Sequence, residues 1–240
     1  MSRNPEVASV TACFPCYNDA LTIASVVQAA RAVLTPLVDE LEIVVVDDGS
    51  SDGSADVLDA LAREVPELVV VRHEHNRGYG GALISAFTTA TKDWIFYTDG
   101  DAQYDAGEAA GLVLVVTPAT DIVQGYKIGR GDRWYRKVIG RVYHRVVKVA
   151  FRLHVRDTDC DFRLFRRSLV ERTPLRSETG VICVEMMRRF EHGGARFVEV
   201  PVHHYARPYG RSQFFRLPHI ARAGVQLGRL WVELMVPPRP

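Results

Sequence analysis

The sequence predicts an α/β fold with a mostly parallel sheet that helices cover on both faces. Three observations indicate this fold. Short apolar runs alternate with helical segments through the first half of the chain. These runs are continuous rather than alternating in polarity, which is typical of parallel strands buried on both faces. Polar, glycine-rich loops follow the runs, where ligands bind in sheets of this kind.

The first half contains seven predicted elements in the order strand, helix, strand, helix, strand, helix, strand. The predicted strands cover residues 7–14, 42–46, 68–72 and 93–97, and the predicted helices cover 19–33, 54–63 and 80–91. Because the carboxyl ends of parallel strands share one edge, we expect the four loops that follow these strands to converge. That layout is typical of a nucleotide site.

The second half, after about Tyr126, contains two predicted amphipathic helices, over 134–153 and 219–234. In the first, one face carries Lys137, Arg141, Arg145, Lys148 and Arg152, and the other carries Val138, Val142, Val146, Val149 and Leu153. In the second, His219, Arg222, Gln226, Arg229 and Glu233 lie opposite Ile220, Gly224, Leu227, Trp231 and Leu234. These helices either pack on the sheet as surface helices or lie in a membrane interface.

Charge is divided unevenly along the 240 residues. Residues 1–126 contain 6 Lys and Arg against 19 Asp and Glu, whereas residues 127–240 contain 24 against 10. An acidic half that holds a cation, facing a basic half that holds anions, explains this division. We expect one domain over 1–212, with a donor-binding half (1–126) and an acceptor half (127–212), followed by an amphipathic extension over 213–240.

The N-terminus shows no secretory signal, and no stretch approaches the ~18 uncharged apolar residues of a spanning helix. Four cysteines indicate a reducing compartment without a disulfide framework. These features predict a cytoplasmic protein that lies on a membrane surface at most.

The most informative motif follows the fourth predicted strand. Asp99 and Asp101 are two carboxylates one residue apart, and the carboxamide of Gln103 lies two residues further on. Hard oxygen donors at this spacing can share Mg²⁺ or Mn²⁺, whose coordination substrate phosphates normally complete. The motif predicts a divalent-cation site at the rim of the sheet.

Five motifs together resemble inverting nucleotide-sugar glycosyltransferases of the GT-A fold, in glycosyltransferase family 2. The branch most similar is that of the dolichyl- and polyprenyl-phosphate sugar synthases. The motifs cover residues 15–18, 44–52, 76–82, 99–103 and 157–165, in the order of the family. The resemblance spans roughly residues 8–215. It implies a hexosyltransferase that moves a sugar from a UDP- or GDP-linked donor to a polyprenyl phosphate at the membrane surface.

The resemblance also implies roles for individual residues. The nucleotide-sugar would be held by Pro15, Tyr17, Asp19, Asp48, Arg77, Asp99, Gly100 and Arg207, with Arg207 on a loop that closes over the donor. Asp101 and Gln103, with Asp99, would ligate Mg²⁺ or Mn²⁺. The acceptor phosphate would be held by Lys127, Arg136 and Arg163. Asp161 would be the catalytic carboxylate, with Asp159 and Glu185 in reserve.

Two other functions compete with this interpretation. The same catalysis could act on a soluble saccharide or natural-product acceptor, because the spanning C-terminal helices of many relatives are missing. The basic helix over 134–153 could instead bind nucleic acid. However, the sequence contains no recognised reader motif, and the acidic half would repel nucleic acid. We therefore expect no nucleic-acid partner.

Overall fold

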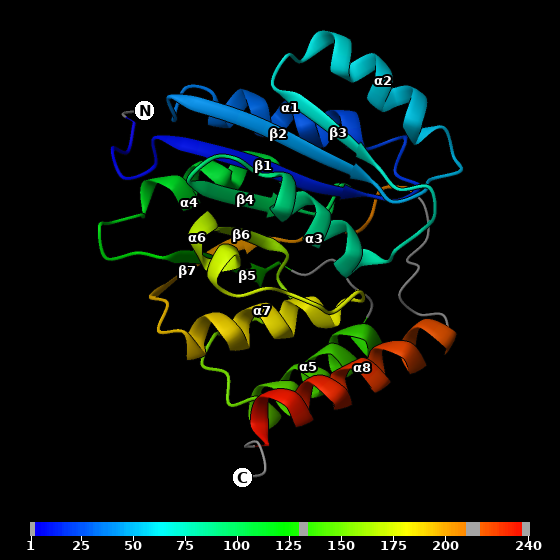
Figure 1. Cartoon of the computed structure of the whole chain (residues 1–240), viewed down its shortest axis with the longest axis vertical. Coiled ribbons are helices and arrows are strands. Elements are labelled where there is room, and N and C mark those ends of the chain that lie inside the picture. The colour runs from blue at the N-terminus through cyan, green and yellow to red at the C-terminus, as the bar shows by residue number, and fades with distance from the viewer. Residues whose placement is uncertain (1–2, 130–133, 210–216, 237–240) are drawn as a thin grey trace.

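A computed structural model describes residues 3–129, 134–209 and 217–236 of the chain (Figure 1). Its seven strands form one sheet in the order β3-β2-β1-β4-β6-β5-β7. The strands are β1 (Ser9–Cys16), β2 (Glu40–Asp47), β3 (Leu68–Arg72), β4 (Trp94–Thr98), β5 (Ile122–Ile128), β6 (Phe162–Arg166) and β7 (Phe197–His203). Only β6 runs antiparallel to its neighbours, β4 and β5. The predicted α/β fold with a mostly parallel sheet is confirmed.

Eight α-helices and one short 3-10 helix connect the strands in the described residues. They are α1 (Ile23–Leu34), α2 (Ser54–Glu64), α3 (Tyr79–Thr89), η1 (Ala106–Glu108), α4 (Ala109–Leu114), α5 (Trp134–Ala150), α6 (Arg167–Arg172), α7 (Val181–His192) and α8 (Leu217–Met235). All seven elements expected in the first half are present, with bounds that differ by a few residues. The largest difference is at α1, which begins at Ile23 rather than residue 19, because Asp19–Thr22 forms a turn whose carbonyl at Asp19 accepts from the amides of Thr22 and Ile23.

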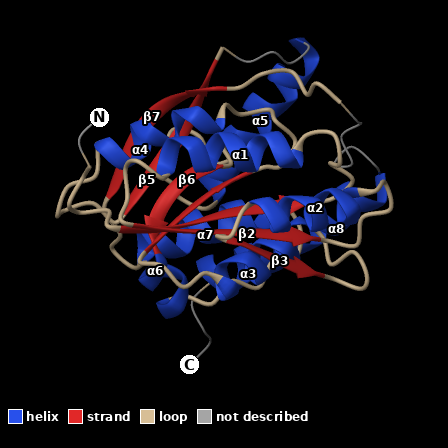
Figure 2. Ribbon diagram, turned by 90° about the horizontal axis from the view of Figure 1, so that it is seen from above, coloured by secondary structure: helices blue, strands red, loops and turns tan. Residues whose placement is uncertain are grey.

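The two faces of the sheet bury two separate apolar clusters. Along β2, Ile43 and Val45 face one cluster, whereas Val44 and Val46 face the other. This alternation follows from the two-residue period of a strand. Helices α1, α2 and α4 contribute to the first cluster, and α3, α5, α6, α7 and α8 contribute to the second. Figure 2 shows α1 and α3 on opposite sides of the strands. Burial on both faces explains the continuous apolar runs in the sequence.

Helix α5 has three faces rather than the predicted two. Val147 and Phe151, just beyond its end, are buried in the second cluster, whereas Val142, Val146 and Val149 are exposed. Arg145 is also exposed. The sequence pattern missed the inward face, because the helix carries apolar residues on two sides. The side chains of 134–139, 141 and 217–220, and the expected domain boundary at 212/213, lie outside what the structure describes. The division into domain and extension stays a prediction.

One close backbone contact fixes the loop that precedes α3. The amide of Gly80 donates to the carbonyl of Glu178 at 2.9 Å, and a Cβ on Gly80 would lie 2.0 Å from the carbonyl oxygen of Ser177. Any side chain at this position would displace backbone. The glycine-rich motif at 78–81 therefore serves close packing of the loop against the segment 177–178.

We expect Gly80→Ala to lower the free energy of unfolding by about 1–3 kcal/mol, because the added methyl overpacks against backbone. Gly111→Ala is the matched control: nothing lies within 4 Å of its Cβ position in α4, so it should be neutral or gain up to about 1 kcal/mol of helix propensity. Urea denaturation measures both. Equal stability of the two variants would contradict the packing described for Gly80.

Candidate active site

The sheet register brings sequence-distant carboxylates together at one rim. Strands β1 to β4 are parallel, so the loops after them share an edge. Because β6 runs opposite to β4 and Thr98 pairs with Phe162, the residues before β6 lie beside those after β4. Asp99 and Asp161 therefore become neighbours. The ends of β5 and β7 reach the same rim, since β5 is antiparallel to β6 and parallel to β7.

Four carboxylates, those of Asp19, Asp99, Asp101 and Asp161, form the centre of this rim. The Tyr79 hydroxyl donates to Asp99 at 2.8 Å. Asp161 accepts from Cys183 Sγ at 3.0 Å and lies 3.6 Å from a guanidinium nitrogen of Arg163. Asp101 and Asp19 both face Arg207. We call these four residues the rim carboxylates.

Burial raises the pKa of three rim carboxylates. The pKa of Asp19 rises to about 6, mainly because burial disfavours its charged form, although Arg207 opposes the shift. The pKa of Asp99 rises well above its usual range, through burial and then the charges of Asp161 and Asp101. Burial also raises the pKa of Asp161 to about 6, although Lys127 opposes it. The rim carries more negative charge than its surroundings compensate, and a bound cation would relieve this imbalance.

Arg207 already lies where such a cation would lie. Its Nη2 donates to Asp101 Oδ2 at 2.5 Å, and its Nη1 lies 3.7 Å from Asp19 Oδ1. Its Nε is buried and makes no hydrogen bond with any described part of the chain. The guanidinium thus fills the gap between two carboxylates at the cost of one unsatisfied donor.

The segment that carries Arg207 is tied to the Asp99–Gln103 turn. The Tyr205 amide donates to the Gln103 carbonyl at 2.8 Å, and Gln103 Nε2 donates to the Tyr205 carbonyl at 3.1 Å. The Gln103 amide also donates to Asp101 Oδ1 at 3.0 Å. The predicted ligand Gln103 therefore lies beside Asp101, but its carboxamide nitrogen is used to hold the neighbouring loop.

The donor set fits a hard divalent cation. The carboxylates of Asp19, Asp99 and Asp101 offer oxygen donors from the ends of two neighbouring strands, which suits Mg²⁺ or Mn²⁺. The raised pKa values of Asp19 and Asp99 are what a site built around a further positive charge would show, whereas the unsatisfied Nε of Arg207 is a donor that lacks an acceptor. These residues could hold the cation that the Asp-x-Asp spacing predicts.

The expected nucleotide contacts Pro15, Tyr17 and Gly100 lie around this cluster. A Cβ on Gly100 would lie 2.9 Å from the Pro15 carbonyl oxygen, so glycine is needed where the first and fourth loops touch. Tyr17 is partly exposed, and its amide donates to Asp19 Oδ2 at 3.3 Å. Asn18 adopts a positive φ of 57° and ties this loop to the next by accepting from the Ser51 amide at 2.8 Å.

Both carboxylate oxygens of Asp48 interact with other residues of the protein. Its Oδ1 accepts from the Arg77 amide at 2.8 Å and lies 2.6 Å from His73 Nδ1, while its Oδ2 accepts from the Gly78 amide at 2.9 Å. These contacts favour a role in fixing the 73–78 loop over the expected direct contact with base or ribose. The Arg77 guanidinium lies 3.4 Å from the Ser85 hydroxyl of α3.

Among the cations expected to hold the acceptor phosphate, Lys127 is half-buried and Arg163 is fully buried. Lys127 Nζ donates to the Asp159 carbonyl, and the Lys127 pKa is raised by Asp157 and further acidic neighbours although burial opposes this shift. Arg163 is fully buried, and its guanidinium donates to Gln124, Tyr97 and the Thr158 carbonyl. These contacts favour a structural role for Arg163 over the expected phosphate contact, because its donors link β4, β5 and the Thr158 carbonyl. The Arg136 side chain lies outside the described residues.

Glu185, expected as a reserve catalytic carboxylate, is also structural. It is fully buried on α7 and accepts from the amides of Arg176 and Ser177, the latter at 2.8 Å. Arg189 donates to it at 2.9 Å. Glu185 thus fixes the segment against which Gly80 packs, and it has no free oxygen directed at the rim carboxylates.

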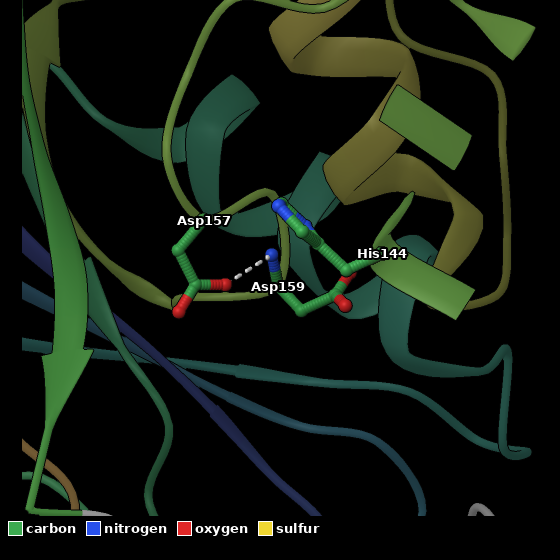
Figure 3. Close-up of side chains that lie close together, drawn as sticks. All are labelled: His144, Asp157 and Asp159. Atoms are coloured by element: carbon green, nitrogen blue, oxygen red, sulfur yellow. Dashed lines mark hydrogen bonds between the residues drawn. The ribbon is translucent and has the colours of Figure 1, made fainter. Parts of the chain in front are cut away.

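His144 is a site residue that the sequence analysis missed. Figure 3 shows it on α5, close to Asp157 and Asp159 of the segment before β6. Potential ligand atoms of the three residues lie within 4.8 Å of one another, and His144 Nδ1 lies 3.1 Å from the Thr158 hydroxyl. Burial raises the Asp159 pKa, with Lys127 opposing the shift. A single histidine among the basic residues of the helix gave no sequence signal for this contact.

The comparisons with known proteins agree with this geometry. The family model for Glycosyl transferase family 2 matches residues 11–173. The chain therefore belongs to this family, whose motifs are the loops that meet at the rim.

Two similar relatives are undecaprenyl-phosphate 4-deoxy-4-formamido-L-arabinose transferases. The protein from Aeromonas hydrophila is 28% identical over 213 residues, covering 88% of this chain and 64% of the relative. The protein from Serratia proteamaculans is 30% identical over 216 residues, covering 89% of this chain and 65% of the relative. The chain thus spans just under two thirds of the length of these relatives.

Solved structures confirm the GT-A fold. Glucosyl-3-phosphoglycerate synthase from Mycobacterium tuberculosis, solved with Mn²⁺, UDP and phosphoglyceric acid, matches with a TM-score of 0.75 and 18% identity over 98% of this chain and 81% of that one. A mannosyltransferase from Pyrobaculum calidifontis, solved with GDP-Man and Mn²⁺, matches with a TM-score of 0.66 and 23% identity over 92% and 64%.

We expect Glu185→Ala to lower the free energy of unfolding by about 3 kcal/mol, because it leaves buried donors without an acceptor. The matched control is Glu171→Ala, which removes an exposed pair with Arg167 and should cost below about 0.5 kcal/mol. Urea denaturation compares them. If Glu185→Ala keeps the stability of the native chain but loses activity, Glu185 has a catalytic rather than a structural role.

Proposed function

We propose that the chain is a metal-dependent, inverting glycosyltransferase that moves a hexose from a UDP- or GDP-linked donor to a polyprenyl phosphate, at the cytoplasmic face of a membrane. The observation that carries this proposal is the cluster of rim carboxylates: the pKa values of Asp19, Asp99 and Asp161 are raised, and the Arg207 guanidinium lies between Asp19 and Asp101. The activity named for the family 2 relatives supports the acceptor.

Each part of the rim has a task in this reaction. Mg²⁺ or Mn²⁺ bound by Asp101, Asp99 and Asp19 would neutralise the donor diphosphate, so that the nucleotide departs without a proton. Pro15, Tyr17 and Gly100 would shape the donor side, and Arg207, which lies beside Asp101, would meet the diphosphate once the cation is bound.

The acceptor oxygen attacks the anomeric carbon while the bond to the diphosphate breaks, which inverts the configuration in one displacement. Asp161, next to Asp99 at the rim, would accept the acceptor proton. Its pKa of about 6 is close to the second pKa of a phosphate monoester, so this transfer is nearly balanced. His144, near Asp157 and Asp159, and Lys127, near Asp161, would favour an anionic acceptor if it binds on this side of Asp161.

The direct test is sugar transfer from UDP- and GDP-sugars to a short polyprenyl phosphate with Mn²⁺ or Mg²⁺. Asp101→Asn should lower kcat/KM by about 100-fold or more, because the diphosphate loses its charge compensation. Asp105→Asn is the control: Asp105 is exposed and caps η1, and asparagine caps equally well, so activity should persist. Full activity of Asp101→Asn would refute the metal role. Transfer to a soluble phosphate monoester but not to polyprenyl phosphate would refute the lipid acceptor.

The pH dependence tests Asp161. Because protonated Asp161 cannot accept a proton, kcat/KM of the native chain should fall about tenfold per pH unit below its pKa of about 6 and be level above it. The residual kcat/KM of Asp161→Asn should lack this decrease at low pH. If the variant keeps this decrease, the titrating group is Asp19 or the acceptor phosphate, and Asp161 is not the base.

A further inference from the structure

Helices α5 and α8 lie side by side at the outer edge of the second apolar cluster, to which both contribute (Figure 1). They contact each other, since Trp231 Nε1 donates to the Ala150 carbonyl at 3.0 Å. Val147 on α5 and Leu230 on α8 are buried beneath them. These inward contacts fix which side of each helix is left facing outward.

The outward sides carry valines. Between 43% and 74% of each of these residues is exposed: Val142, Val146 and Val149 on α5, Val225 and Val232 on α8, and Val236 just beyond the end of α8. Their spacing of three, four or seven residues places them along one stripe of each helix. Exposed apolar residues that gather in this way mark an interaction surface rather than ordinary surface composition.

Basic residues border both stripes. Arg145 lies beside the valines of α5, and Arg222 and Arg229 lie beside those of α8. Arg222 also pairs with Glu178 at 2.5 Å. An apolar stripe between cations complements a surface that is apolar inside and anionic outside. Two copies of this face would instead bring like charges together, which disfavours a symmetric pair.

We infer that the valine stripes of α5 and α8 are a docking face for an anionic phospholipid bilayer, with the valines in the acyl boundary and the arginines at the head groups. The choice of a bilayer rests on the proposed function. No described helix is long and apolar enough to cross a membrane. The face would bind peripherally through the summed contribution of two helices.

The same two helices contact segments that support the candidate active site. On α5, His144 contacts Thr158 in the segment before β6. On α8, Gln226 accepts from the Thr179 hydroxyl at 2.8 Å, in the segment whose Glu178 carbonyl fixes Gly80. A bilayer on the docking face therefore contacts the elements that support both the acceptor side and the glycine-rich loop.

The test is flotation of the full chain with phosphatidylcholine vesicles with and without about one third phosphatidylglycerol. We expect binding that needs the anionic lipid and weakens at high salt. The double variant Val146→Glu with Val232→Glu should bind vesicles at least about tenfold more weakly than the native chain. Leu114→Glu on α4, an equally drastic change at an exposed apolar side chain elsewhere, should bind as the native chain does.

Arg145→Gln with Arg229→Gln checks the charge contribution without adding an acid, and should reduce binding and its salt dependence. Thermal melting shows that the variants are folded. If the valine variants bind vesicles as the native chain does, the inference is overturned. It is also overturned if the native chain binds no vesicles but forms a dimer that these variants convert to monomer. If the protein binds donor and Mn²⁺ but does not float with vesicles, the proposed glycosyl transfer stands and the docking face is refuted. If the protein floats with vesicles but transfers no sugar to polyprenyl phosphate, the docking face stands and the proposed transfer is refuted.

Discussion

The uncompensated negative charge at the rim of the sheet is the constraint around which the site is arranged. Four carboxylates from three separate loops lie close together there, and burial raises the pKa values of three of them, Asp19, Asp99 and Asp161. Such a cluster costs free energy in an empty site and is expected where a ligand brings the missing charge. Arg207 reduces this cost without removing it, since the pKa of Asp19 stays raised despite the neighbouring guanidinium.

Much of the remaining polar chemistry keeps these carboxylates in place. Asp48 holds the 73–78 loop, Arg163 joins the segments around Asp161, and Glu185 fixes the segment behind Gly80. Each has its hydrogen-bonding groups directed at protein partners. The rim is therefore preorganised: a bound donor would meet carboxylates whose supporting loops are already held.

The first half of the fold was predictable because each strand is an uninterrupted apolar run between turn residues. In the second half helices α5 and α8 were predictable, but the strands were not. Strand β5 contains Gln124, Gly125 and Lys127, and β6 contains Arg163, because a buried Arg163–Gln124 hydrogen bond replaces apolar packing there. Polar strands of this kind do not show the pattern of a buried strand.

The sequence predicted only part of the site, because its motifs identify loops but not the long-range contacts of each side chain. The motifs identified the loops that meet, including Asp19, Asp99, Asp101, Asp161 and Arg207. They could not distinguish a carboxylate or guanidinium that faces the rim from one that is consumed by the fold, as Arg163 and Glu185 are. That difference depends on long-range contacts, which also explains why His144 gave no signal.

The most direct measurement of the central claim is Mn²⁺ binding to the donor-free protein, followed by the paramagnetic signal of free Mn²⁺. If the rim carboxylates form a cation site that Arg207 occupies in the meantime, Asp101→Asn should abolish binding. Arg207→Gln should bind Mn²⁺ about tenfold more tightly than the native chain, because the competing guanidinium is gone. Equal affinity of all three proteins for Mn²⁺ would contradict the account.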